Sequence, residues 1–499
     1  RSITYRDLRA RARRCAAGLM EAGVAKGTPV ALLMANRPEW VISAFAVSLA
    51  GGVIVPLSTF ATIDERDHLL RHSDTSVLIF QRTLLKRDFL QELSSSATPG
   101  LGKLFCLGLD RAAGPIQPWE ALISDADPAL VDARAAVVGP DDLGVLLYTS
   151  GTSAEPKGVL HSQRAPVIQS YRSAEYLRLG PEDRVLTSQP FFWAAGFATS
   201  LGGTLAAGAT LLLQETFEPN AALDIVERER ATCLLAWPHQ EKAMATHPSA
   251  ASRDLKSLRK LNFSSALAPL VGLSSDQWGK QGGYGLSETF TVACNLVADA
   301  RAELRRTTNG RPLPGTEVRV VDPATGAPRP PGVEGEIYVR GATLMRGYHK
   351  GGTGSDAEGW FHTEDSGWFD EAGYLHWTGR LSNLIKTGGA NVAPLEVERA
   401  LSTREELRHA AVVGVPHPTL GEVVVLCAIP RDGARVDGQE IQRYLRARLA
   451  SYKVPRAVLL FTDEELGYTG NQKLRLPAVR RAALKRLEET HAELSGFRY

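Results

Sequence analysis

Residues Tyr148–Gly158 read YTSGTSAEPKG and combine small, hydroxyl-bearing and glycine residues with a lysine. Glycines let backbone N–H groups approach phosphate oxygens, hydroxyls add donors, and a lysine adds positive charge. The apolar run Leu143–Tyr148 predicts a short buried strand, so the loop would leave the end of a sheet. The order Lys157-Gly158 differs from a Walker A loop, which needs Lys followed by Ser or Thr. A Ser/Thr/Gly surface turn is the alternative. The predicted phosphate ligands are Thr149, Ser150, Gly151, Thr152, Ser153 and Lys157.

The chain before this loop alternates helical and strand patterns. Leu8, Ala12, Cys15 and Leu19 recur at steps of three and four, which predicts a helix that Gly23 ends. A second helix is expected from about Pro38 to Leu49. The expected strands are Pro29–Met34, Val53–Leu57 and Val77–Phe80, with a second unit at Arg184–Thr187 and Ala209–Leu213. This βαβ order predicts largely parallel sheets covered by helices on both faces.

The pattern changes to strands and turns beyond Gly315. Glu317–Asp322 and Gly335–Arg340 are expected strands, separated by a segment rich in proline and glycine. The last hundred or so residues mix both patterns and end in an expected helix from Ala478 to Leu494. No internal repeat or low-complexity segment is evident.

Composition excludes several classes of protein. At 499 residues, 44% hydrophobic and 22% charged, the chain should form two or more globular domains. The net charge of +2 disfavours nucleic acid as an obligatory partner. The five cysteines are scattered, which predicts neither a disulfide framework nor a zinc site. No apolar run approaches the ~20 residues that span a bilayer, and no signal-peptide pattern is present, so a cytoplasmic protein is expected.

Four further motifs follow the glycine-rich loop. They are GYGLSE at Gly283–Glu288, GWFHTED at Gly359–Asp365, TGR at Thr378–Arg380 and TGNQKL at Thr469–Leu474. Each motif alone is weak evidence for a nucleotide site, because each of its residues could instead be a core aromatic or a solvated surface charge. As an ordered set they resemble the adenylate-forming enzymes, the superfamily of acyl-CoA synthetases, peptide-synthetase adenylation domains and beetle luciferases. The resemblance extends from Ser2 to about Arg486.

The resemblance implies an α/β fold in two domains. Residues 1–381 would form a large N-terminal domain with two α/β parallel-sheet subdomains and a small distorted β-barrel. Residues 382–499 would form a small, mobile α+β lid.

A nucleotide site that uses ATP, Mg²⁺ and coenzyme A is also implied. The ring of Tyr284 would stack on adenine, and Asp365 would accept hydrogen bonds from both ribose hydroxyls. Glu288 would hold magnesium with Thr149, and Lys473 would be the catalytic lysine of adenylation. The remaining candidates are Gly283, Gly285, Ser287 and Arg380 for the nucleotide, with Gly388 and Gly389 for the pantetheine arm of coenzyme A.

The implied reaction has two halves. A carboxylate attacks the α-phosphate of ATP to give acyl-AMP and pyrophosphate, and a thiol then displaces AMP. In the family the small domain rotates between the halves, which would remove Lys473 and bring in Gly388 and Gly389.

The chain departs from the family pattern at several positions. Ala154 stands where the phosphate loop usually has glycine, and Ser382 stands at the usual hinge aspartate or lysine. Glu364 replaces the glycine that usually precedes the ribose aspartate. The stretch between Leu270 and Gly283 is shorter than usual, so either part of a helix and strand is lost there or the given sequence omits residues.

An aromatic cluster follows the expected strand at Arg184–Thr187 and indicates which kind of acyl substrate the protein binds. Trp193 would stand between the acyl pocket and the coenzyme A tunnel and gate that tunnel, or it would simply pack the core. No aspartate is placed to bind an α-amino group, so an apolar or aryl carboxylic acid is expected. The substrate-facing candidates are Trp193, Phe197, Trp237, His239, Ala266 and Ala268.

Three functional hypotheses remain open. The first is a complete acyl-CoA ligase, and the second is a partial enzyme that forms the thioester from a preformed acyl-adenylate. The third is a catalytically silent nucleotide-binding protein on the same fold. A luciferase-like oxygenase, a carrier-protein pantetheine arm in place of coenzyme A, and a homodimer also stay open.

Overall fold

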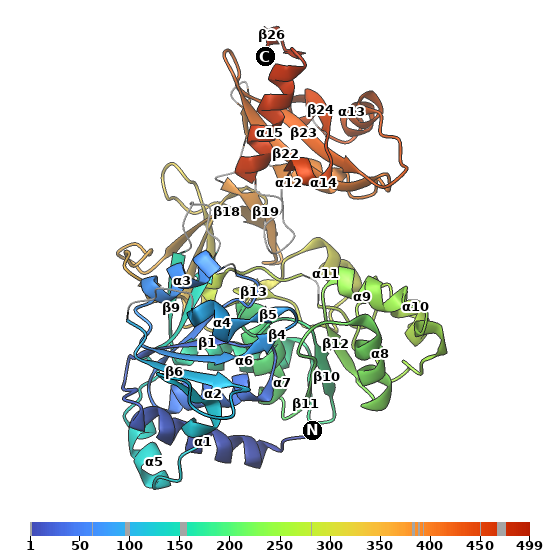
Figure 1. Cartoon of the computed structure of the whole chain (residues 1–499). Helices are drawn as coiled ribbons and strands as arrows, with labels where there is room; N and C mark the ends of the chain where they lie inside the picture. Colours follow the sequence, from blue (N-terminus) through green and yellow to red (C-terminus); the bar gives the residue numbers. More distant parts are fainter. Residues whose placement is uncertain are drawn as a thin grey trace. The chain divides into compact units, whose positions relative to one another are not determined.

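The structure is a computed structural model that describes residues 2–61, 63–94, 100–149, 157–280, 282–381, 385–387, 390–392, 394–449, 451–466 and 476–499 (Figure 1). Its contacts divide the chain into two compact units. The first unit comprises Arg1–Val318 with Val339–Phe361, and the second comprises Arg319–Tyr338 with His362–Tyr499. The expected domain boundary at residues 381 and 382 stays a prediction.

An eight-stranded sheet forms the centre of the first unit, in the order β17-β9-β8-β2-β1-β3-β6-β7. The strands that carry the βαβ pattern are parallel, whereas β9 runs antiparallel to both β8 and β17. Their bounds are β1 Pro29–Leu33, β2 Val53–Pro56, β3 Val77–Gln81, β6 Lys103–Leu107, β7 Ile116–Pro118, β8 Leu143–Thr149, β9 Lys157–Ser162 and β17 Gly347–Tyr348. The expected parallel α/β organisation is therefore confirmed.

Helices bury both faces of this sheet. Val30 and Leu32 of β1 join one hydrophobic cluster, while Ala31 and Leu33 join another, because successive side chains of a strand point to opposite faces. The first cluster includes α1 (Tyr5–Glu21), α2 (Pro38–Leu49) and α5 (Pro128–Ala136). The second includes α3 (Ile63–His72) and α4 (Phe89–Ser94). Strands covered on both faces read as apolar runs, as these do.

A smaller parallel sheet in the same unit has the order β11-β10-β12. Its strands are β10 Arg184–Thr187, β11 Thr210–Leu213 and β12 Cys233–Leu235, and α8 (Pro219–Arg228) packs on it beside α9 (Pro238–Ala245). α6 (Arg164–Tyr176) precedes this sheet, and a π-helix at Ala195–Gly202 with α7 (Gly203–Ala206) joins β10 to β11. The helix α10 covers only Ala268–Val271 and ends at Gly272, whose φ is 76°. Neither helix nor strand occurs among the described residues from 273 to 280. The expected shortening of this stretch relative to the family stays a prediction.

A four-stranded sheet, β15-β16-β18-β19, provides much of the N-terminal part of the second unit. Its strands are β15 Thr316–Val321, β16 Gly335–Gly341, β18 Phe361–Phe369 and β19 Leu375–Arg380. The C-terminal part contains β20 Ile385–Thr387, β21 Ala390–Val392, β22 Leu407–His417, β23 Gly421–Pro430 and β24 Ala457–Leu460. The helices are α12 Pro394–Ala400, α13 Gly438–Arg446, α14 Asp463–Leu466 and α15 Leu476–Glu489.

The final helix is shorter than the sequence predicted. α15 ends at Glu489, and Glu493–Leu494 instead forms β25, which pairs with Phe497–Arg498. His491 and Ser495 adopt left-handed φ values of 48° and 51°, which a continuing α-helix does not allow. Within the described residues, no helix is long and apolar enough to cross a membrane.

Candidate active site

The predicted phosphate loop is presented from adjacent strand ends. β8 ends at Thr149 and β9 begins at Lys157, and these two residues lie directly opposite each other in the antiparallel register. The loop therefore leaves and re-enters the sheet at one edge, as its sequence predicted. The four candidates between the strands, Ser150, Gly151, Thr152 and Ser153, lie outside the described residues.

A tyrosine connects two of the predicted site residues. Lys157 Nζ lies 5.3 Å from the centre of the Tyr348 ring, a cation–π distance. The Tyr348 hydroxyl donates to Glu288 Oε1 at 3.0 Å. The strand β17 brings Tyr348 here, because it pairs with β9 and places Tyr348 opposite Val159. The structure thus groups the lysine predicted to bind phosphate and the carboxylate predicted to bind magnesium around a residue that the sequence analysis missed.

The turn that carries Tyr284 and Glu288 is tightly folded. Tyr284 is buried and bridges Cys294, with its N–H donating to the Cys294 carbonyl at 2.9 Å. A Cβ on Gly285 would lie 1.7 Å from the Thr291 carbonyl oxygen, so only glycine fits. Gly283 is less restricted, because its Cβ would lie 3.3 Å from Asn295 Oδ1.

His161 supports this turn from the neighbouring strand. Its Nε2 lies 2.8 Å from the Ser287 carbonyl oxygen, and its ring packs edge-on against Phe290 at 4.8 Å. Burial lowers the pKa of His161 to about 4, so the ring is neutral at pH 7. A carbonyl only accepts hydrogen bonds, so Nε2 must carry the proton. The sequence analysis missed His161, because this residue belongs to none of the motifs and its partner Ser287 lies 126 residues away.

The two candidates for ribose face each other in the second unit. Asp365 on β18 and Arg380 at the end of β19 are register partners in the antiparallel pair. Asp365 is buried, and its backbone N–H donates to Thr363 Oγ1 at 3.1 Å. The Arg380 side chain lies outside the described residues. Glu364 adopts a left-handed φ of 56°, which explains why glycine suits this position.

The predicted acyl-side aromatics separate into two groups. Trp193 makes edge-on contacts with Phe192 at 5.5 Å and with Trp237 at 6.3 Å, and a tilted contact with Phe60 at 6.0 Å. Phe60 is 58% exposed and was not expected here. Phe197 instead contacts Trp40 and Phe290, at 5.2 and 5.7 Å, and so packs against the core of the unit.

The remaining candidates are placed less completely. Ala268 is buried in α10, whereas Ala266 is exposed just before it. His239 belongs to α9, but its side chain lies outside the described residues. Lys473, Gly388 and Gly389 also lie outside the described residues, so their roles stay predictions.

The oxygen donors of the first unit suit the predicted cofactor. Glu288 and Thr149 offer a carboxylate and a hydroxyl, and Mg²⁺ binds oxygen ligands. No group of three or more His, Cys, Asp or Glu residues that could hold a metal occurs in the described part of the chain. Magnesium would therefore take its other ligands from phosphate oxygens and water, as it commonly does.

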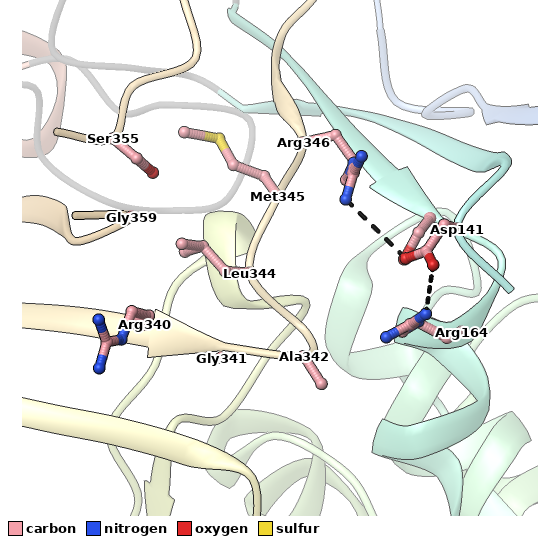
Figure 2. A pocket seen from close by; sticks show the side chains of 11 residues that line it. Asp141, Arg164, Arg340, Gly341, Ala342, Leu344, Met345, Arg346, Ser355 and Gly359 are labelled. Atoms are coloured by element: carbon pink, nitrogen blue, oxygen red, sulfur yellow. Dashed lines mark hydrogen bonds and ion pairs between the residues drawn. The ribbon is translucent and has the colours of Figure 1, made fainter. Parts of the chain in front are cut away.

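A cavity of about 340 Å³ in the first unit is lined by none of the predicted ligands. Figure 2 shows Arg164 and Arg346 directed toward Asp141, at 2.6 and 3.9 Å. Met345 lines this cavity, and its N–H donates to the Glu288 carbonyl at 2.8 Å. Because Asp141 already neutralises part of the arginine charge, the cavity is a less suitable phosphate site than the loop at Lys157.

Comparison with known proteins gives matches over nearly the whole chain. A model of the AMP-binding enzyme family matches residues 1–349, and a model of the AMP-binding enzyme C-terminal domain matches residues 396–473. A feruloyl-CoA synthase from an Amycolatopsis species is 36% identical over 494 residues, covering 96% of this chain and 94% of that protein. An indoleacetate–CoA ligase from Aromatoleum aromaticum is 32% identical over 507 residues, covering 98% and 95%.

Solved structures agree with the fold. The ATP-bound RpMatB-BxBclM chimera B3 superimposes with a TM-score of 0.80 at 26% identity, covering 97% of this chain and 94% of that one. The predicted fold class is thus confirmed.

Proposed function

Because the chain belongs to the AMP-binding enzyme family and is an AMP-forming acid–thiol ligase that uses ATP, Mg²⁺ and coenzyme A, we propose that its acid is apolar or aryl. The acid is activated as an acyl-adenylate and then transferred to the thiol. The observation that carries the proposal is the contact between Trp193 and Trp237, which belong to the segments that follow the parallel strands β10 and β12. Ligands of open α/β sheets bind beyond the carboxyl ends of such strands.

The aromatic cluster supports an aryl acid because flat rings stack well against other rings. Offset or edge-on aromatic pairs contribute about 0.5–1.5 kcal/mol beyond their buried area. Phe60 is exposed and contacts Trp193, so it would cover a ring bound beside Trp193. Two relatives, a feruloyl-CoA synthase and an indoleacetate–CoA ligase, are also named for aryl acids. If these aromatics only packed the core, changing their size would alter stability without altering acid preference.

The adenylation half would depend on charge placed around Tyr348. Lys157 would neutralise phosphate oxygens, and Glu288 would hold Mg²⁺ in an orientation that the Tyr348 hydroxyl maintains. Bound Mg²⁺ supplies charge stabilisation at the phosphates. Asp365 would hold the ribose, and Lys473 would contact the α-phosphate. Loss of one such contact costs roughly 2.7–4 kcal/mol if oxyanion-hole losses are a guide.

The thioester half would use different residues. Gly388 and Gly389 would admit the thin pantetheine arm after rotation of the C-terminal domain, and Trp193 would gate its passage. Ala154 and Ser382 are the residues that favour the partial-ligase alternative, in which only this half occurs.

A paired assay tests the proposal. Pyrophosphate release is measured from ATP and a panel of aryl and apolar acids, and thioester formation is measured from the matching synthetic acyl-adenylates and coenzyme A. The complete ligase performs both, and Lys473→Ala abolishes only pyrophosphate release, while the exposed control Lys485→Ala changes neither. Thioester formation from adenylates alone, unaffected by Lys473→Ala, would establish the partial ligase instead. Activity restricted to small polar acids would refute the proposed substrate class.

A further inference from the structure

A strained piece of backbone follows Glu288 in the turn that carries the predicted nucleotide residues. Phe290 and Thr291 have φ values of 50° and 103°. Both values are left-handed, a region that glycine occupies freely and that a β-branched residue such as threonine rarely adopts. The surrounding structure must therefore hold these two residues in place. Strain of this kind clusters at binding and catalytic sites.

A glutamine side chain contacts the backbone on both sides of the strained pair. Gln169 Nε2 donates to the Thr289 carbonyl at 2.9 Å and to the Val292 carbonyl at 2.7 Å. These two acceptors directly flank Phe290 and Thr291 in the chain. Because the amide NH₂ group offers two protons, a single side chain satisfies both carbonyls and fixes the distance between them.

Gln169 is itself held firmly in the first unit. It lies on α6 and is 0% exposed, so water cannot replace the hydrogen bonds that it makes. Arg172, three residues further along the same helix, donates to Gln169 Oε1 at 3.4 Å and to Thr343 Oγ1 at 3.3 Å. Since a guanidinium group only donates, this contact fixes the amide oxygen toward Arg172 and the amide NH₂ toward the turn.

The strained pair also packs against the residues that precede Glu288. The Thr291 carbonyl oxygen approaches Gly285 so closely that a Cβ there would lie 1.7 Å from it. The Tyr284 carbonyl accepts a hydrogen bond from the Ala293 N–H at 2.8 Å. A relaxation of the strained pair would therefore displace both Tyr284 and Glu288, the predicted ligands of adenine and magnesium.

We propose that Gln169 is a positioning residue that holds Phe290 and Thr291 in their left-handed conformation and so presets Tyr284 and Glu288 for ATP and Mg²⁺. This inference rests on the proposed function, because it assumes that Tyr284 and Glu288 bind the nucleotide and its metal. Without Gln169 the turn relaxes, and only the molecules that keep the strained turn bind ATP. The apparent Kd then rises by the inverse of that fraction.

The test is equilibrium binding of ATP in the presence of Mg²⁺, measured by calorimetry on the full chain below its melting temperature. Gln169→Met keeps the length of the side chain and removes both donors. It should raise the Kd for ATP by about 10- to 100-fold, because about 1–10% of the molecules keep the competent turn.

The matched control is Gln81→Met, which removes an equally buried glutamine from the same unit. Gln81 is 2% exposed and hydrogen-bonds to the Ala35 N–H, the Thr83 carbonyl and the Glu215 carboxylate. Gln81→Met should lower the melting temperature by a similar amount and leave the Kd for ATP within about twofold of wild type.

A second substitution separates the strain from a general loss of packing. Glycine adopts left-handed φ values without strain, so Thr291→Gly removes the reason for the turn to relax. Added to Gln169→Met, it should lower the Kd for ATP by about two- to fivefold relative to Gln169→Met alone. A double variant that binds ATP no better than Gln169→Met would overturn the role of strain.

The design separates failure of this inference from failure of the proposed function. An unchanged Kd in Gln169→Met, or an equal rise in Gln169→Met and Gln81→Met, would overturn the role of Gln169 and leave the ligase intact. A wild-type protein that binds no ATP would overturn the adenylation half of the proposed function itself. If Gln169→Met does not fold, Gln169→Glu takes its place, because its carboxylate keeps the shape, pairs with Arg172 and has no proton to donate to the turn.

Discussion

Removing the Tyr348 hydroxyl should weaken magnesium-dependent adenylation while leaving the second half-reaction intact. Tyr348→Phe deletes the 3.0 Å hydrogen bond to Glu288 Oε1 but keeps the ring that lies 5.3 Å from Lys157 Nζ. The substitution therefore tests the orientation of the carboxylate separately from the cation–π contact.

The magnitude follows from the type and burial of this bond. A hydrogen bond to a charged group contributes about 1.5–3 kcal/mol. Tyr348 and Glu288 are both only half-buried, so water can replace part of the lost contact, and we take the lower end of the range. About 1.5 kcal/mol corresponds to roughly a tenfold change in the Mg²⁺ concentration needed for half-maximal activity.

The assay is acid-dependent pyrophosphate release as a function of Mg²⁺ concentration, with thioester formation from a synthetic acyl-adenylate measured in parallel. Tyr171→Phe is the control, because Tyr171 is 66% exposed and lies on α6. A Tyr348→Phe enzyme with an unchanged Mg²⁺ requirement would refute the reasoning. So would an equal loss in both half-reactions, because that would indicate general damage to the fold.

Three further predictions concern the backbone and the buried histidine. Glu364→Gly should stabilise the protein by about 0.5–1 kcal/mol in urea unfolding, since relief of left-handed strain exceeds the added chain entropy. Gly285→Ala should lower the free energy of unfolding by about 1–3 kcal/mol and abolish the rise in melting temperature caused by AMP, because the new Cβ would lie 1.7 Å from the Thr291 carbonyl oxygen. The control is Gly352→Ala, which has open space around it and should change the free energy of unfolding by less than about 0.5 kcal/mol. Burial lowers the pKa of His161 to about 4, so folding favours the neutral ring by about 3 kcal/mol. This contribution to the free energy of unfolding is fully present above pH 6.5 and is lost as the pH falls toward 4. His161→Gln should flatten the dependence of unfolding free energy on pH across that window.

Each of these predictions has a clear contrary result. A less stable Glu364→Gly protein would mean that the exposed glutamate contributes a contact greater than the strain. If AMP still raised the melting temperature of the Gly285→Ala protein, the turn at Gly285 would not be needed for nucleotide binding. An unchanged pH slope in His161→Gln would show that other groups control acid unfolding.

Local patterns in the chain predicted most of the first unit. The helix Pro38–Leu49 has the bounds that the sequence predicted, and β1, β2, β3 and β8 agree within a residue or two. These elements are predictable because apolar runs bounded by glycine or proline specify buried strands with little help from tertiary contacts. The last helix was predicted to continue five residues beyond its end at Glu489, because the left-handed residue at His491 has no distinct local signal.

The residues of the candidate site were predictable only where they belong to a continuous sequence motif. Thr149, Lys157, Tyr284 and Glu288 belong to such motifs, whereas the Tyr348 hydroxyl reaches Glu288 from 60 residues away. His161 lies 126 residues from the Ser287 carbonyl that it supports. The sequence analysis placed Phe197 beside Trp193 as a substrate-facing residue, whereas in the structure Phe197 packs against Trp40 and Phe290.

The amino-acid sequence by itself therefore determined the family, the alternation of helix and strand, and the edge of the sheet that presents the phosphate loop. Tertiary structure alone decided which groups meet there: Tyr348 with Glu288, and His161 with the Ser287 carbonyl. The physical reason is that backbone propensity and hydrophobic period act over a few residues, whereas these contacts depend on strand pairing and close packing between distant segments.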